Sequence, residues 1–201
     1  MKFGSALIGC ALAFVLALPA AAHEQQYAGT FLGTSESPSN ASPGTGSALV
    51  TVDFDLVTMR VQASFSGLVT APAGGVTASH IHCCLPGSPN PLNAGVATQV
   101  PSFTGFPLGV TAGSYDHLFD MSLADSYNPA FVTANASVSG AFNALVNGLN
   151  AGNAYFNIHT SAFPAGEIRA LLAPVPEPET WALLGAGLGL LSFVARRRAK
   201  A

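Results

Sequence analysis

The residues with the most reactive side chains stand close together near the middle of the sequence. His80 and His82 are separated by one isoleucine, and Cys83 and Cys84 follow directly. In a β-strand, side chains two residues apart point to the same face, and their Cα atoms lie roughly 6.5–7 Å apart. If residues 78–84 include a strand, two imidazole rings can therefore converge on one metal ion.

A third histidine, His159, lies far along the chain within the run Asn-Ile-His-Thr. Together with His80 and His82 it can complete a set of three imidazole ligands. Histidine and thiolate ligands suit copper or zinc, so these two metals are the cofactors that the pattern favours. The alternative is a strand without metal, in which each ring bonds a nearby carbonyl or carboxylate group.

The first 22 residues have the features of a secretory signal peptide in the usual order. Lys2 supplies the positive start, residues 6–18 are apolar, and alanines at positions 20–22 offer a cleavage site for signal peptidase. We therefore expect an exported chain whose mature part begins near His23. The domain that follows spans residues 23–174.

Residues 175–201 contain a second apolar segment with different flanks. A stiff stretch with Pro176, Glu177 and Pro178 comes first, residues 180–195 are apolar, and Arg196, Arg197 and Arg198 follow. Sixteen helical residues span roughly 24 Å, a little short of the roughly 30 Å thickness of a bilayer core. We expect a transmembrane helix that anchors the chain in the inner membrane. By the positive-inside rule the arginines stay in the cytoplasm and the domain faces the periplasm.

The charge of the central domain argues against nucleic acid as a partner. Residues 23–174 hold two cations, Arg60 and Arg169, and eight acidic residues, which gives a formal net charge of −6. No basic patch is available to neutralise phosphates.

Export also affects how the cysteines are interpreted, because the compartment outside the cytoplasm is oxidising. Cys10 leaves with the signal peptide, so only Cys83 and Cys84 remain. We favour a disulfide between these neighbours, which closes a strained eight-membered ring. The alternatives are free thiols, intermolecular bridges or metal thiolates.

Period-two alternation indicates a mostly β domain. Apolar residues at positions 59, 61, 63 and 65 alternate with polar ones, and positions 48–54 repeat the pattern. The expected strands are Tyr27–Leu32, Ala48–Phe54, Thr58–Phe65, Val76–His82, Gly95–Val100, Ser114–Leu123, Ala154–Thr160 and Glu167–Leu172.

Two segments depart from this pattern. Apolar residues recur at helical spacing over Ser137–Leu149, which predicts one short helix, and Thr34–Gly46 has the composition of an exposed loop. The expected fold is an antiparallel, immunoglobulin-like β-sandwich with one short helix. A signal helix at the N-terminus and a transmembrane helix at the C-terminus flank it.

Residues 25–172 resemble the CHRD domain, which carries an Ala-x-His-Ile-His element and, near its end, Asn-x-His-Thr followed by Gly-Glu-Ile-Arg. These elements stand here at positions 78–82, 157–160 and 166–169. The resemblance implies an immunoglobulin-like sandwich without established enzymatic activity. It also implies a cluster of the three histidines with Asn157, Glu167 and Arg169. Within it Glu167 could pair with Arg169 or fix a histidine tautomer, or the cluster could be a buried polar network that joins two strands.

The C-terminal tail resembles the PEP-CTERM sorting signal, whose three parts appear in order. They are the Pro-Glu-Pro motif, the apolar span and the basic cluster. The resemblance implies recognition by an exosortase-type transpeptidase, cleavage near the motif, and delivery to the cell envelope or extracellular matrix. It also associates the chain with exopolysaccharide.

No nucleophile elbow or zinc-protease helix motif is present, so we expect a non-catalytic protein. It would bind polysaccharide, matrix protein or a surface through exposed loops. The competing expectation is a copper- or zinc-binding protein, possibly with redox activity, that uses the His-x-His strand.

Overall fold

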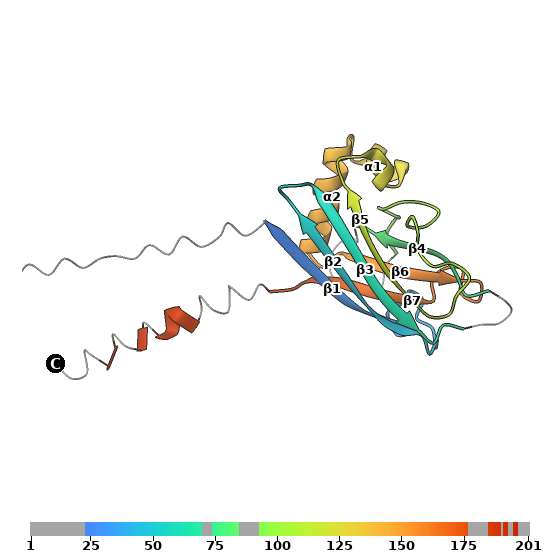
Figure 1. Ribbon diagram of the computed structural model, residues 1–201, viewed down its shortest axis with the longest axis horizontal. Helices are drawn as coiled ribbons and strands as arrows, with labels where there is room; N and C mark the ends of the chain where they lie inside the picture. The colour runs from blue at the N-terminus through green and yellow to red at the C-terminus, as the bar shows by residue number, and fades with distance from the viewer. Residues whose placement is uncertain are drawn as a thin grey trace, which may run out of the picture.

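A computed structural model describes residues 23–69, 74–84, 93–176, 185–189, 191–192 and 195–196. These residues form a β-sheet domain with two α-helices and two 3-10 turns (Figure 1). The strands are β1 Glu24–Leu32, β2 Thr45–Asp53, β3 Thr58–Ser66, β4 Val76–His82, β5 Gly113–Asp120, β6 Ala154–Thr160 and β7 Ile168–Pro174. The helices are α1 Pro129–Ala134 and α2 Val138–Asn150, and the 3-10 turns are η1 Gly33–Ser35 and η2 Ala124–Ser126.

All seven strands belong to one antiparallel sheet, in the order β4-β6-β7-β1-β2-β3-β5. The expected immunoglobulin-like sandwich needs two separate sheets, so this part of the prediction is corrected. The physical reason lies in β1. It pairs with β2 along its whole length, and on its other edge Tyr27, Ala28 and Leu32 pair with β7. β1 thereby joins what would otherwise be two sheets.

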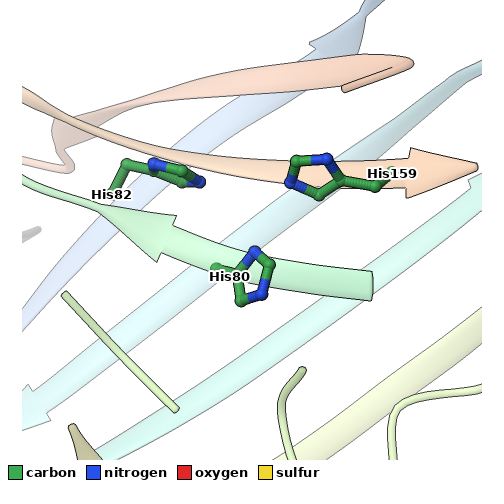
Figure 2. A group of neighbouring side chains, drawn as sticks. All are labelled: His80, His82 and His159. Atoms are coloured by element: carbon green, nitrogen blue, oxygen red, sulfur yellow. The ribbon is translucent and has the colours of Figure 1, made fainter. Parts of the chain in front are cut away.

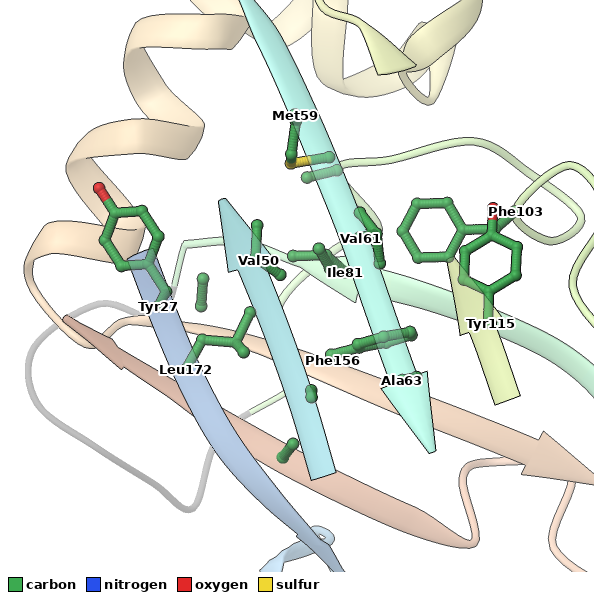
Figure 3. Close-up of a cluster of buried hydrophobic side chains, with 14 of the residues drawn as sticks. Tyr27, Val50, Met59, Val61, Ala63, Ile81, Phe103, Tyr115, Phe156 and Leu172 are labelled. Carbon is green, nitrogen blue, oxygen red and sulfur yellow. The ribbon is translucent and has the colours of Figure 1, made fainter. Parts of the chain in front are cut away.

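The sheet curls so that side chains from its two halves meet in one core (Figure 3). Phe31 on β1 contacts Phe156 on β6, with ring centroids 5.1 Å apart, and Phe156 also contacts Phe103. The alternation expected in β3 is confirmed, since Met59, Val61, Ala63 and Phe65 are all buried. The same period that produced the sequence pattern therefore fills the core.

Helix α2 forms where the helical spacing predicts it, and its buried residues are Ala141, Leu145, Gly148 and Leu149. Ser137 caps its first turn by accepting a hydrogen bond from the backbone of Gly140. The short helix α1 was not expected. Its sequence signal is Asn128 before Pro129, a capping side chain followed by the residue that suits a first helical turn.

The strand expected over Gly95–Val100 is wrong, because this segment makes only isolated bridges at Val96 and Thr98. It runs along the free edge of β4, where the backbone of Ala97 donates to Ile81. Further along, Phe103 donates to Ser79. A sheet edge covered in this way cannot pair with another chain.

In the part of the chain that the structure describes, no helix has the length and apolar character needed to cross a membrane. Within the span expected over 180–195, residues 185–189, 191–192 and 195 are helical. The rest of that span, the predicted signal peptide over residues 1–22, Glu177, Pro178, Arg197 and Arg198 lie outside the described residues.

The core makes the following prediction about stability. Phe156→Ala removes a ring that is fully buried among aromatic side chains, so we expect it to lower the free energy of unfolding by about 3–5 kcal/mol. Leu118→Ala is the control, because Leu118 is 61% exposed and should change stability little. Urea denaturation of both variants measures the difference, and equal effects would contradict this description of the core.

Candidate metal-binding site

Antiparallel pairing of β4 with β6 brings the three histidines to one face of the sheet. In this register Ala78 lies opposite His159, and His80 lies opposite Asn157. Paired residues share a face, as do residues two apart on one strand. His80, His82 and His159 therefore point toward one another, and one ring nitrogen from each lies within 4.8 Å of the others (Figure 2).

The second nitrogen of each ring contacts a backbone carbonyl oxygen. His80 Nε2 lies 2.7 Å from the carbonyl of Pro101, His82 Nδ1 lies 2.8 Å from that of Ala94, and His159 Nδ1 lies 2.9 Å from that of Pro164. A carbonyl oxygen can only accept, so these three nitrogens must carry the protons. We assign the tautomers on this ground.

The remaining nitrogens, His80 Nδ1, His82 Nε2 and His159 Nε2, are then unprotonated acceptors. All three are buried and have no hydrogen-bond partner. A ring that gives one N–H to a backbone carbonyl and keeps a free lone pair on its other nitrogen is arranged like a metal-bound histidine.

The electrostatic surroundings keep these rings neutral. Burial lowers the pKa of all three histidines, and it lowers that of His82 to about 4. The carbonyl contacts oppose this shift, but burial is the larger effect in each case. At neutral pH the free lone pairs are therefore available to a cation.

An ion pair that the sequence did not suggest lies beside the histidines. Arg169 is 1% exposed, and its guanidinium lies 2.7 Å from the carboxylate of Glu36. It also donates to Asn93 Oδ1 at 2.7 Å. Its Cζ lies 3.8 Å from the centre of the Tyr155 ring, which in turn stacks on His82 at 4.7 Å.

The expected partners of Glu167 are therefore corrected. Arg169 pairs with Glu36, because residues 33–44 fold back over β7 and bury Glu36 at 4% exposure. Glu167 instead accepts hydrogen bonds from Ser42, from the backbone of Val69 and from Thr160. The histidine tautomers are fixed by carbonyl groups in place of Glu167.

The segment Thr34–Gly46 was expected to be an exposed loop. Glu36 within it is buried instead, because it pairs with Arg169. Asn40 donates to the backbone of Glu167, and Asn93 donates to Ser37. The only available sequence signal was indirect, since a cation on a core strand needs a buried acid. Asn157 is buried as expected, between His80 and Arg169 in register.

Cys83 and Cys84 are joined to each other by a disulfide bond. Their sulfurs face α2, 3.7 and 3.3 Å from the carbonyl oxygen of Ala144, while His82 points to the other face of the sheet. In this state the two sulfurs are not thiolates and do not belong to the histidine cluster. Of the sorting motif, Pro176 and Arg196 are the residues that the structure describes.

The CHRD domain family model matches residues 30–172, well over half of the chain, and this range contains all three histidines. The chain belongs to the CHRD family. No curated protein and no solved structure matches it. The register of β4 and β6 brings the histidines of the two CHRD motifs together.

The PEP-CTERM protein-sorting motif matches residues 174–198, directly after the CHRD domain. This motif implies export, recognition by an exosortase-type enzyme and sorting to the envelope or the extracellular space. The CHRD domain therefore acts outside the cytoplasm.

The first prediction from the site concerns pH and the metal-free protein. The pKa of His82 falls from 6.5 to about 4 on folding, so the unfolded chain binds more protons between these values. Stability is therefore present above about pH 6.5 and is lost as the pH falls toward 4, by roughly 3 kcal/mol for this residue. Urea unfolding across this range should show a shallower pH profile for His82→Gln. An unchanged profile would contradict the assignment.

The second prediction concerns the buried ion pair. Glu36→Ala leaves the Arg169 charge buried without a carboxylate, so we expect a loss of about 3–5 kcal/mol in the free energy of unfolding. The control is Asp116→Ala, which breaks the exposed Arg60–Asp116 pair and should change stability little. Thermal or urea unfolding of the two variants would refute this if Glu36→Ala were as mild as the control.

Proposed function

We propose that this exported CHRD protein binds one divalent transition-metal ion through His80, His82 and His159. A single observation carries the proposal. Three buried, unpartnered ring nitrogens lie within 4.8 Å of one another, and the opposite side of each ring is held by a backbone carbonyl.

The energetics of the free nitrogens favour a ligand over a purely structural network. A buried acceptor without a partner costs about 1–3 kcal/mol, and three acceptors cannot satisfy one another because none carries a proton. A cation between them satisfies all three at once. The alternative expected from the CHRD resemblance, a buried polar network of the histidines with Asn157, Glu167 and Arg169, would leave these three nitrogens without a donor.

The donor set points to zinc or copper. Imidazole nitrogens suit both metals, and tetrahedral zinc bound at about 2 Å holds its ligands roughly 3.3 Å apart. The three rings would therefore draw closer by about an ångström or more, within the reach of small side-chain rotations. The described residues supply three ligands, so a fourth position is left for water or another small ligand.

A non-catalytic role fits the neighbours of the site. General acid–base catalysis beside the ion would use a side chain that is free to accept a proton, such as a carboxylate. Among the described residues, the buried carboxylates of Glu36 and Glu167 are engaged elsewhere, Glu36 with Arg169 and Glu167 with three hydrogen-bond donors. We therefore propose metal binding or metal-dependent stabilisation in place of an oxidoreductase.

The cellular setting that we propose follows the two ends of the chain. Signal peptidase would remove residues 1–22, and residues 180–195 would hold the domain at the periplasmic face of the inner membrane until the exosortase-type enzyme acts. The processed protein would then join the envelope or matrix, where exopolysaccharide or matrix protein is the proposed neighbour. The sorting motif supports this order of events.

The experiment is metal analysis of the exported chain after loading with zinc or copper and desalting. We expect close to one ion per chain, and its loss in the His80→Ala/His82→Ala variant and in His159→Ala. His117→Ala is the matched control, because His117 lies on β5 outside the cluster, and it should keep its metal. A wild-type chain that retains no metal would refute the proposed function.

A further inference from the structure

The disulfide between Cys83 and Cys84 lies directly after the strand that carries two of the proposed ligands. β4 ends at His82, and the next two residues form the bond. Cys83 is buried at 4% exposure, whereas Cys84 is exposed. Cys84 is therefore the residue of the pair that solvent reaches, whereas Cys83 lies within the domain.

Helix α2 is shaped to receive the bonded pair. Gly148 is buried in the last turn of α2, and a glycine within a helix costs up to about 1 kcal/mol relative to alanine. A Cβ atom at this position would collide with Cys83 Sγ and would lie 2.7 Å from Cys84 Sγ. The missing side chain thus provides the space in which both sulfurs lie.

The residues that form the disulfide also fix the segment whose carbonyl group orients His82. The backbone N–H of Cys83 donates to Gly95 at 3.1 Å, and the neighbouring residue Ala94 supplies the carbonyl that contacts His82 Nδ1. The position of Cys83 and the orientation of the His82 ring therefore depend on one short piece of chain.

We propose that Cys83–Cys84 is a site of thiol–disulfide exchange whose redox state sets the metal affinity of the three-histidine site. The bonded form is the high-affinity form, and a small thiol or dithiol reductant is the reactant. This inference rests on the proposed function, because it concerns the regulation of the same site.

The exchange is balanced in atoms and electrons. A thiolate attacks the sulfur of Cys84, the exposed residue of the pair, the bond between the two cysteines breaks, and Cys83 leaves as a thiolate that takes up a proton. A second thiolate then attacks the mixed disulfide, which releases Cys84. The two reductant thiols become one external disulfide, and the protein gains two electrons and two protons.

Reduction must change the packing against α2. Bonded sulfurs are about 2 Å apart, whereas unbonded atoms of this kind need roughly 3.5 Å or more. Both sulfurs already lie against α2, at Gly148 and at the carbonyl of Ala144, so either the turn or the helix has to move. The backbone N–H of Cys83 donates a hydrogen bond to Gly95, next to Ala94. This movement therefore disturbs the contact between the Ala94 carbonyl and His82.

The freed thiols do not replace the lost contact. In the bonded form both sulfurs face α2, while the ligand nitrogens lie on the opposite face of the sheet. Loss of an outer contact to a metal-binding histidine typically weakens affinity about 10–100-fold. We therefore expect the reduced protein to bind zinc at least about tenfold more weakly.

The test compares zinc affinity of the exported chain in two states. One sample is kept oxidised, and the other is reduced with excess dithiol and then desalted without oxygen. Free-thiol titration verifies each state, and competition with a chromophoric chelator gives the affinity. The Cys83→Ser/Cys84→Ser variant should bind like the reduced protein and should not respond to the dithiol.

The outcomes separate this inference from the proposed function. Weaker zinc binding by the reduced chain, with a variant that ignores the reductant, supports the exchange site. Equal affinity in two samples with verified thiol content overturns the inference and leaves the metal site standing. Absence of zinc binding in both states overturns the proposed function itself.

Discussion

A guanidinium group that is almost fully buried needs partners for its charge, and Arg169 finds them in segments far apart along the chain. Glu36 comes from the loop after β1, and Tyr155 comes from β6. Asn93 comes just before the segment that covers the edge of β4. Each contact fixes one of the pieces that surround the histidines. The loop carrying Asn93 continues into Ala94, and the Tyr155 ring supports His82. The buried charge of Arg169 is costly without partners. Its contacts therefore fix the segments that surround the three neutral histidines.

The charge of Arg169 is paired and the three histidines are neutral, which explains why the site can accept a cation. A cation placed among the three histidines meets lone pairs without protons, while the adjacent positive charge of Arg169 is already balanced by Glu36. Had Glu36 been absent, the guanidinium would oppose the ion across the face of the sheet. The pairing of Glu36 with Arg169 thus removes a repulsion on the ion, although neither residue belongs to the histidine cluster.

Much of this arrangement could be predicted from sequence, since β4 and β6 have the bounds that alternation indicates. The three histidines could be singled out because the residues themselves carry the chemistry. Other features could not be predicted. Alternation does not reveal that β1 pairs on both edges, so one sheet was taken for two. The carbonyl groups of Ala94, Pro101 and Pro164 belong to the backbone, which every residue has, and only the fold selects them.

The position of β7 determines how the domain would respond to a pull on its C-terminal tail. The sorting tail leaves the domain at the end of β7, and this strand lies between β1 and β6 inside the sheet. Tension on the tail pulls β7 along its own axis, so the hydrogen bonds on both of its edges are loaded in shear and must give way together. A tail leaving from β4 or β5 would instead peel an edge strand away one bond at a time. A pull on the C-terminal end of the domain would therefore meet more resistance than a pull on an edge strand.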